Sequence, residues 1–81
     1  MNVVVKLFGA EADAAGREEI AVPLEEASTC ARLRQRLAEL EPRLGSHLPA
    51  CRFAVNHEFV GDDYRLAEDD EVALIGLVSG G

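Results

Sequence analysis

The residues that follow Asn2, Val3-Val4-Val5-Lys6-Leu7-Phe8, are apolar apart from Lys6, and such a run is typical of a β-strand. The segment is rich in β-branched residues, and Gly9 closes it. We therefore expect a strand over residues 3–8. Its two faces carry Val3, Val5 and Leu7 on one side and Val4, Lys6 and Phe8 on the other.

Over residues 18–24 large apolar residues recur at every second position, which predicts a second strand that forms a hairpin with the first. Its apolar side carries Ile20, Val22 and Leu24. Pro23 lacks a backbone N–H, so we expect this strand at a sheet edge or with Pro23 near its end. Between the two strands, residues 10–15 predict a short helical turn that ends at Gly16 in a left-handed conformation.

The clearest helical spacing lies between residues 28 and 41. Ser28 or Thr29 can cap the free amides of the first turn. Pro42 disfavours helical geometry at the residue before it, so the helix is expected to end near Glu41. Apolar residues recur at intervals of three and four and form one stripe: Cys30, Leu33, Leu37 and Leu40.

After a connector over residues 45–50, the pattern predicts strands at 52–56 and 71–75 and a brief one at 58–60, with a turn at Asn56-His57 and a turn at Asp69-Asp70. Leu66 stands alone in a polar loop and is expected to fill the core. The element order predicts an α+β fold, in which one main helix packs on one face of a mixed sheet. The first and last strands are rich in Val, Leu and Ile, so we expect them to be central, parallel neighbours.

Composition narrows the class of protein. With 81 residues the chain forms one domain, and a net charge of −7 argues against a nucleic-acid binder. No run approaches the ~20 apolar residues of a membrane span. The first residues lack the basic region of a secretory signal. Together with only two cysteines, Cys30 and Cys51, this makes the reduced cytoplasm the expected compartment.

Catalytic motifs are missing from the sequence. No serine lies in a nucleophile-elbow context, and no Cys/His spacing resembles a metal site. His47 and His57 fall in predicted loops, where a solvated histidine is the expected state. Each cysteine is expected to be a small core or boundary residue. The chain therefore offers no enzyme site of its own.

The last two residues are Gly80 and Gly81. One interpretation is a loose terminus or a cloning remnant. The other is that two residues without side chains form a thin, flexible thread that carries the terminal carboxylate into another protein's active site. A carboxylate becomes a good electrophile when it is converted to a mixed anhydride, usually an acyl-adenylate. A chain that works in this way needs no catalytic side chains.

Five segments occur in an order and spacing that are specific when taken together. They are Leu7-Phe8 followed by Ala14-Ala15-Gly16, Ser28-Thr29 at a helix start, Val55-Asn56-His57-Glu58-Phe59-Val60, Leu66-Ala67-Glu68-Asp69-Asp70-Glu71-Val72-Ala73-Leu74, and Val78-Ser79-Gly80-Gly81. On these segments the whole chain resembles the MoaD/ThiS family of ubiquitin-like sulfur carriers. The resemblance implies a β-grasp domain over residues 1–75 and a flexible Gly-Gly tail over residues 76–81.

The resemblance also implies a function in molybdenum cofactor biosynthesis. An ATP-dependent activating enzyme of the MoeB type would adenylate the Gly81 carboxylate, and a sulfur donor would convert it to a thiocarboxylate, a C-terminal 1-thioglycine. The tail, kept thin by Gly80, would then enter a MoaE-type large subunit of molybdopterin synthase. There it would give its sulfur to cyclic pyranopterin monophosphate. The chain itself would be a non-catalytic carrier that binds no permanent cofactor or metal.

A partner interface follows from the same resemblance, because apolar residues on the exposed sheet face dock the partners in this family. The matching positions are Phe8, Phe59 and Ile75, and the tail adds Leu77, Val78 and Ser79. The alternation agrees, since Phe8 shares a face with Lys6; the alternative is that these residues complete a small core. The family suggests a heterotetramer of two small and two large subunits.

Two departures from the family pattern affect the prediction. Gly76-Leu77 stands where the family often has Pro-Pro, so the tail should be less rigid before binding. The turn Asp69-Asp70 has Asp where Gly is usual, which leaves its local geometry open.

Other functions remain as alternatives. One is a ThiS-type carrier for thiamine synthesis, although such chains are usually shorter. Another is a ubiquitin-like modifier that is joined to lysines of target proteins, and a third is an interaction module with an incidental Gly-Gly. The sequence leaves open the choice between molybdenum and tungsten, the sulfur donor and the partner affinities.

Overall fold

The first two strands form the expected hairpin. The computed structural model describes residues 1–76, and β1 (Asn2–Leu7) pairs antiparallel with β2 (Glu19–Pro23). Burial alternates along both strands, and β2 lies at the edge of the sheet with Pro23 at its end. Both strand predictions are confirmed.

The link between these strands is a helix, α1 (Gly9–Ala15). It ends at Gly16, whose φ of 69° lies in the left-handed region, as predicted. The Gly16 amide donates to carbonyls of the last turn of α1, at Ala12 and Asp13. A side chain from elsewhere completes this end, because Arg43 Nη2 donates to the Ala15 carbonyl at 2.9 Å.

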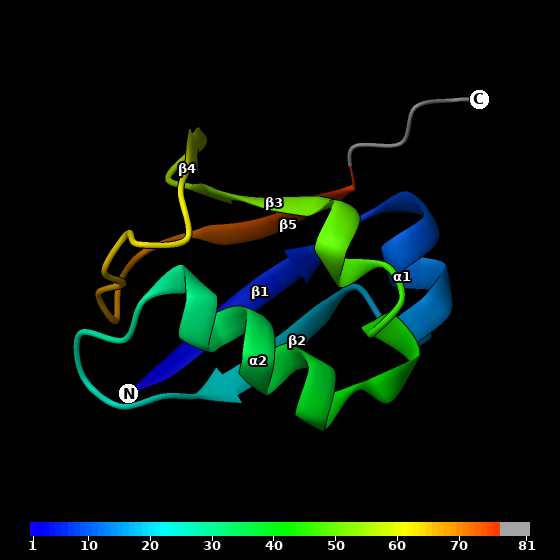
Figure 1. Ribbon diagram of the computed structural model, residues 1–81, viewed down its shortest axis with the longest axis horizontal. Helices are drawn as coiled ribbons and strands as arrows, with labels where there is room; N and C mark the ends of the chain where they lie inside the picture. Colours follow the sequence, from blue (N-terminus) through cyan, green and yellow to red (C-terminus); the bar gives the residue numbers. More distant parts are fainter. Residues whose placement is uncertain (77–81) are drawn as a thin grey trace.

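The main helix, α2 (Cys30–Leu40), covers one face of the sheet (Figure 1). Thr29 is its cap, since its Oγ1 accepts from the Arg32 amide at 3.3 Å. The stripe prediction is confirmed for the buried residues Cys30, Leu33 and Leu37 and is wrong for Leu40, which is 43% exposed.

Leu40 is exposed because it is the last residue of α2. The chain continues into a short 3-10 helix, η1 (Pro42–Leu44), and Leu44 is completely buried there. Leu44 therefore occupies the core position that the helical period had assigned to Leu40. The connector ends in a second 3-10 helix, η2 (Leu48–Ala50).

The second half of the chain supplies β3 (Cys51–Val55), β4 (Glu58–Val60) and β5 (Val72–Gly76). The β3–β4 turn is made by Asn56 and His57, which both have positive φ, as suits this predicted turn. The last strand runs one residue beyond the prediction, through Gly76. Leu66 is buried, as predicted, in the loop between β4 and β5.

Asp69 and Asp70 form the turn before β5 without left-handed backbone. The Asp70 amide donates to the Ala67 carbonyl at 3.0 Å, and the Asp70 carboxylate accepts from the Ala67 amide at 2.8 Å. Asp70 also accepts from the Asn56 side chain at 3.0 Å. A glycine is therefore not required at this turn.

Within residues 1–76 the sheet has five strands in the order β2-β1-β5-β3-β4. β1 and β5 run parallel near the centre, as predicted, and the other neighbours are antiparallel. The core lies between the sheet and α2, and its fully buried side chains include Val5, Leu7, Leu33, Leu37, Phe53 and Leu74. The molecule is an α+β, ubiquitin-like β-grasp domain, which confirms the predicted fold class.

Candidate functional site: the open face of the sheet and the end of β5

The face of the sheet opposite α2, which we call the open face, carries the three predicted interface residues. Phe8 and Phe59 are each 53% exposed, and Ile75 is partly buried. Because Leu7 pairs with Leu74 in the parallel ladder, Phe8 lies beside Ile75. Phe59 lies farther across the sheet, on β4, and is joined to this pair through β3.

A pocket of about 310 Å³ marks the place where Phe8 and Ile75 meet. Its floor contains Ala54 and Ala73, which are direct partners in the β3–β5 ladder. Small side chains in the centre of the open face leave the neighbouring aromatic ring exposed. The predicted alternative, that these residues only complete the core, does not describe Phe8 and Phe59.

Charged residues surround this apolar centre. Lys6 Nζ lies 3.6 Å from Glu71 Oε2, and His57 Nε2 lies 3.6 Å from Glu71 Oε1. On the other side, the Arg52 guanidinium lies 4.8 Å from the centre of the Phe59 ring. An apolar centre with a polar rim is the usual anatomy of a protein–protein interface.

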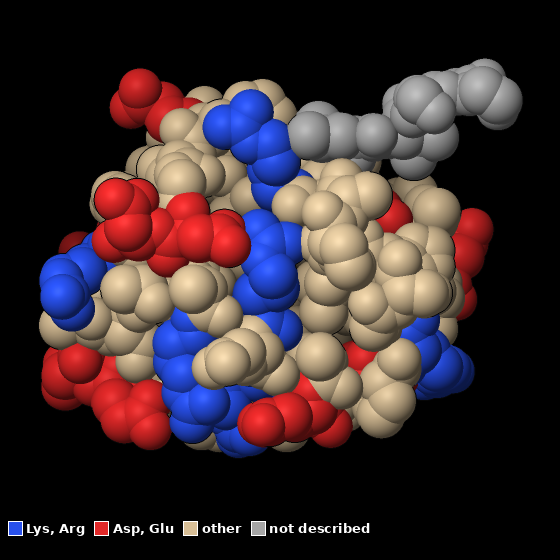
Figure 2. Space-filling view, in the orientation of Figure 1, with Lys and Arg blue, Asp and Glu red and all other residues tan. Residues whose placement is uncertain are grey.

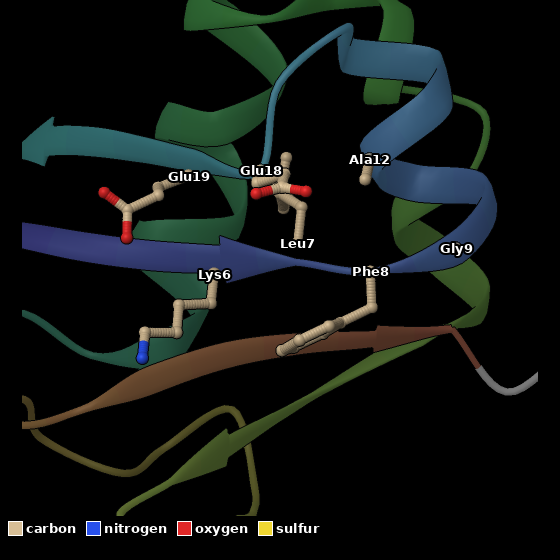
Figure 3. A pocket seen from close by; sticks show the side chains of 7 residues that line it. All are labelled: Lys6, Leu7, Phe8, Gly9, Ala12, Glu18 and Glu19. Atoms are coloured by element: carbon tan, nitrogen blue, oxygen red, sulfur yellow. The ribbon is translucent and has the colours of Figure 1, made fainter.

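A second hollow, of about 660 Å³, adjoins the first at the end of β1 (Figure 3). Figure 3 shows Lys6 of β1, and Phe8 just after β1, pointing toward β5. Ala12 comes from α1, and Glu18 and Glu19 come from the β2 side. Phe8 lines both hollows. Its ring is therefore the most accessible apolar group at this corner of the open face.

The opposite side of the molecule is charged (Figure 2). Figure 2 shows Lys and Arg side chains in a band across the side covered by α2, with Asp and Glu beside them. Three arginines of α2 contact carboxylates: Arg32 with Glu25 at 3.5 Å, Arg34 with Asp62 at 2.8 Å, and Arg36 with Glu39 at 2.6 Å. The two sides of the molecule thus present different chemistry.

The predicted chemical residues lie at the end of the chain. Gly76 closes β5 directly after Ile75, so the last described residue follows a residue of the open face. The predicted tail residues Leu77, Val78, Ser79, Gly80 and Gly81 lie outside the described residues. The structure therefore places the root of the tail and leaves its reactive end as a prediction.

The sequence did not point to a buried polar contact near this root. Glu11, on α1, is 6% exposed, and its Oε2 lies 2.9 Å from His47 Nδ1. His47 is therefore not the solvated loop histidine that was expected, whereas His57 is exposed. The one sequence signal for the burial of Glu11 was its four-residue spacing from Ala15, which places both side chains on the same face of α1.

Both cysteines are buried, as predicted, and belong to the core. Burial raises the pKa of Cys30 to about 11, with the charge of Asp62 adding to it. Burial likewise raises the pKa of Cys51 to about 11, and the Glu11 carboxylate adds to it. Both thiols remain protonated at neutral pH, so neither is an activated nucleophile.

Residues 1–76 contain neither a cluster of metal ligands nor a helix suited to a membrane. In this part of the chain no three His, Cys, Asp or Glu side chains gather as metal ligands would. None of its helices has the length and apolar character that a bilayer span requires.

Comparison with known proteins assigns the family. The model of the ThiS family matches residues 5–81. A molybdopterin synthase sulfur carrier subunit from Dictyostelium discoideum is 33% identical over 81 residues, which cover 95% of this chain and 93% of that protein.

Two solved structures share the fold. SAMP1 from Haloferax volcanii, a small archaeal modifier protein, has a TM-score of 0.89 and 26% identity, with both chains fully covered. A chain from the Helicobacter pylori complex of molybdopterin-converting factor subunits 1 and 2 has a TM-score of 0.70 and 23% identity, also with full coverage. The resemblance inferred from the sequence motifs is confirmed, and this chain belongs to the ThiS family.

Proposed function

We propose that this protein is the sulfur carrier subunit of a molybdopterin synthase. The proposal rests above all on one observation: an exposed apolar face adjoins the end of the strand that leads to Gly80-Gly81. A carrier of this kind needs its docking surface close to the point where the C-terminal tail begins, so that a docked partner can receive the terminal carboxyl. The name of the D. discoideum relative supports the same role.

The chemistry takes place at the main-chain carboxylate of Gly81. An activating enzyme of the MoeB type transfers the adenylyl group of ATP to this carboxylate and releases pyrophosphate. A sulfur nucleophile from the donor then displaces AMP and leaves a thiocarboxylate, a C-terminal 1-thioglycine. Gly80 and Gly81 suit this step because the absence of side chains lets the thread enter a narrow channel.

The acceptor is cyclic pyranopterin monophosphate, bound by a MoaE-type large subunit in a heterotetramer of two small and two large chains. The H. pylori relative by fold was solved as a complex of its two subunits, which supports such an assembly. Phe8 and Ile75 form the centre of the docking surface, with Phe59 at its border. The carrier supplies no catalytic side chain and holds no permanent cofactor.

Intact-mass measurement tests the proposal. The full chain is incubated with activating enzyme, ATP and a sulfur source, and the expected product is heavier by the replacement of one oxygen by sulfur at Gly81. A matched control carries one alanine after Gly81 and is expected to gain no sulfur. Sulfur transfer from that control, with the alanine still attached, would contradict the proposal.

A reconstituted synthase identifies the pathway. The thiocarboxylated chain and the large subunit are expected to convert the pterin precursor to molybdopterin, whereas a ThiS-type carrier would support thiazole formation instead. Product formation in the thiazole system alone would overturn the assignment to molybdopterin synthase.

Protein modification is a second candidate function, favoured by the likeness to SAMP1. The same acyl-adenylate can react with a lysine amine to form an isopeptide bond. Expression of the tagged chain in its native cell, followed by tryptic digestion and mass spectrometry, tests for lysines that carry residues 66–81 as a remnant, because Arg65 is the last tryptic site in the chain. Their absence under conditions in which the thiocarboxylate accumulates would exclude this function.

A further inference from the structure

The buried carboxylate of Glu11 has three neighbours near the end of β5. It lies against His47, beside the Cys51 thiol, and against the backbone of Gly76. A buried carboxylate is costly unless its oxygens are hydrogen-bonded. The 2.9 Å contact between Glu11 Oε2 and His47 Nδ1 supplies such a hydrogen bond. We call Glu11, His47 and Gly76 the tail-root cluster.

Position 76 favours glycine because the Glu11 carboxylate leaves no room for a Cβ atom there, and not because the backbone conformation requires glycine. A Cβ atom at this position would lie 2.5 Å from Glu11 Oε1 and 2.9 Å from Glu11 Cδ. Contacts this short do not occur, so any side chain at Gly76 would push the carboxylate away from His47. The φ of Gly76 is not in the left-handed region that would itself require glycine.

The cluster joins three separate parts of the fold. Glu11 comes from α1, His47 precedes η2, and Gly76 pairs with Cys51 at the end of the β3–β5 ladder. Gly76 thus lies between the β3–β5 ladder on one side and the Glu11 carboxylate on the other. This carboxylate packs against the backbone at the point from which residues 77–81 continue.

We propose that Glu11 is a positioning residue for the activation of the terminal carboxyl, because it fixes the backbone of Gly76 at the root of the tail. The proposal rests on the carrier function proposed above. In the resembling family a proline pair often precedes the Val-Ser-Gly-Gly end, and a proline ring restricts φ covalently. Here the buried Glu11 carboxylate would restrict the backbone at position 76 instead of a proline ring. The proline ring and the carboxylate cannot both be present, because a proline Cβ at position 76 would collide with Glu11.

A double-mutant cycle tests the contact. Gly76→Ala is expected to lower the urea midpoint of the wild-type chain but not that of the Glu11→Ala chain, where the space is free. Equal shifts in both backgrounds would show that Glu11 does not constrain position 76, and would overturn the proposal.

Turnover by the activating enzyme tests the positioning role. Pyrophosphate release is followed with the full chain and its variants, and Glu11→Leu is expected to lower kcat about 10–100-fold with little change in KM, because the docking face is intact while the carboxyl is misplaced. Glu11→Gln keeps a partner for His47 and is expected to retain most of the rate. Glu39→Gln, on the exposed side of α2, is the matched control and is expected to be silent.

Rescue separates positioning from simple stability. Glu11→Ala, which like Glu11→Leu removes the carboxylate but also frees the space, combined with Gly76→Pro exchanges one device for the other and is expected to recover most of kcat, whereas Gly76→Pro alone is expected to lose it. A folded Glu11→Leu chain that turns over at the wild-type rate would overturn the proposal. Should Glu11→Leu not fold, Gly76→Ala decides, because it keeps Glu11 but displaces it, and an unchanged kcat would overturn the proposal.

The wild-type reaction distinguishes this failure from failure of the carrier function. If wild type releases no pyrophosphate with any activating enzyme of the MoeB type, the carrier function fails. If wild type and Glu11→Leu are activated equally, the carrier function stands and the positioning role alone is wrong.

Discussion

The covered face and the open face of the sheet differ most clearly along a single strand. On β1, Val3, Val5 and Leu7 are at most 2% exposed, whereas Val4 and Phe8, the residue that follows β1, are 44% and 53% exposed on the other face. In a chain of 81 residues with one main helix, that helix can cover only one of the two faces of the sheet. The covered face therefore carries stability, and the open face keeps apolar groups available for a partner.

The largest expected effect is on the covered side. Leu37→Ala removes a side chain with no exposure, and we expect the free energy of unfolding to fall by about 2–5 kcal/mol. Leu40→Ala, three residues later on the same helix, is the matched control, and a loss below about 1 kcal/mol is expected because Leu40 is 43% exposed. Urea unfolding measures both. Equal losses would contradict the placement of Leu40 outside the core.

The loss of stability at alkaline pH tests how completely the two cysteine thiols of the core are buried. Burial raises the pKa of Cys30 and of Cys51 from 9 to about 11, so the unfolded chain ionises first. Stability from this source is complete below pH 9 and is lost as the pH rises toward 11, by about 2–3 kcal/mol for each thiol. Urea unfolding between pH 8 and 11 measures the decline. Cys51→Ala should show a shallower decline than wild type, and an unchanged slope would contradict the burial of this thiol.

The open face should respond in binding and not in folding. Phe8→Asp is expected to weaken association with the large subunit by about 10–100-fold, because an exposed aromatic anchor is replaced by a charge. The urea midpoint of the isolated domain should hardly change. Calorimetric titration measures binding. Unfolding of this variant would refute the surface assignment of Phe8, and unchanged affinity would refute its role in docking.

The smallest expected effect concerns two contacts between an arginine and a phenylalanine ring, one on each face of the sheet. Arg34 lies 5.1 Å from the Phe53 ring and also donates to the Leu48 and Cys51 carbonyls, whereas Arg52 lies over Phe59 and makes no such bond to any residue from 1 to 76. We expect Arg34→Ala to cost about 1–3 kcal/mol and Arg52→Ala about 0.5 kcal/mol in urea unfolding. A larger loss for Arg52 would mean that the open face also contributes to stability.

Most of the fold could be predicted because its signals are local. The β-branched run over residues 3–8, the alternation over residues 18–24, the stripe that starts at Cys30 and the turn at Asn56-His57 each indicate which backbone geometry a short segment prefers. The failure at Leu40 marks the limit of this reasoning. Periodicity assigns a direction to a side chain, but whether Leu40 or Leu44 fills the core depends on where the chain turns after α2.

The candidate site divides along the same line. The exposure of Phe8 follows from its place in an alternating strand, and the Gly80-Gly81 ending is visible in the sequence itself. The tail-root cluster is different, because Glu11, His47 and Gly76 are far apart in sequence and share no period. The sequence by itself determined the elements, since each depends on neighbouring residues, and it is the source of the proposal for Gly80-Gly81. Only the tertiary structure decided which buried carboxylate meets which glycine, since that contact exists only after α1, the connector before β3 and the last strand have packed together.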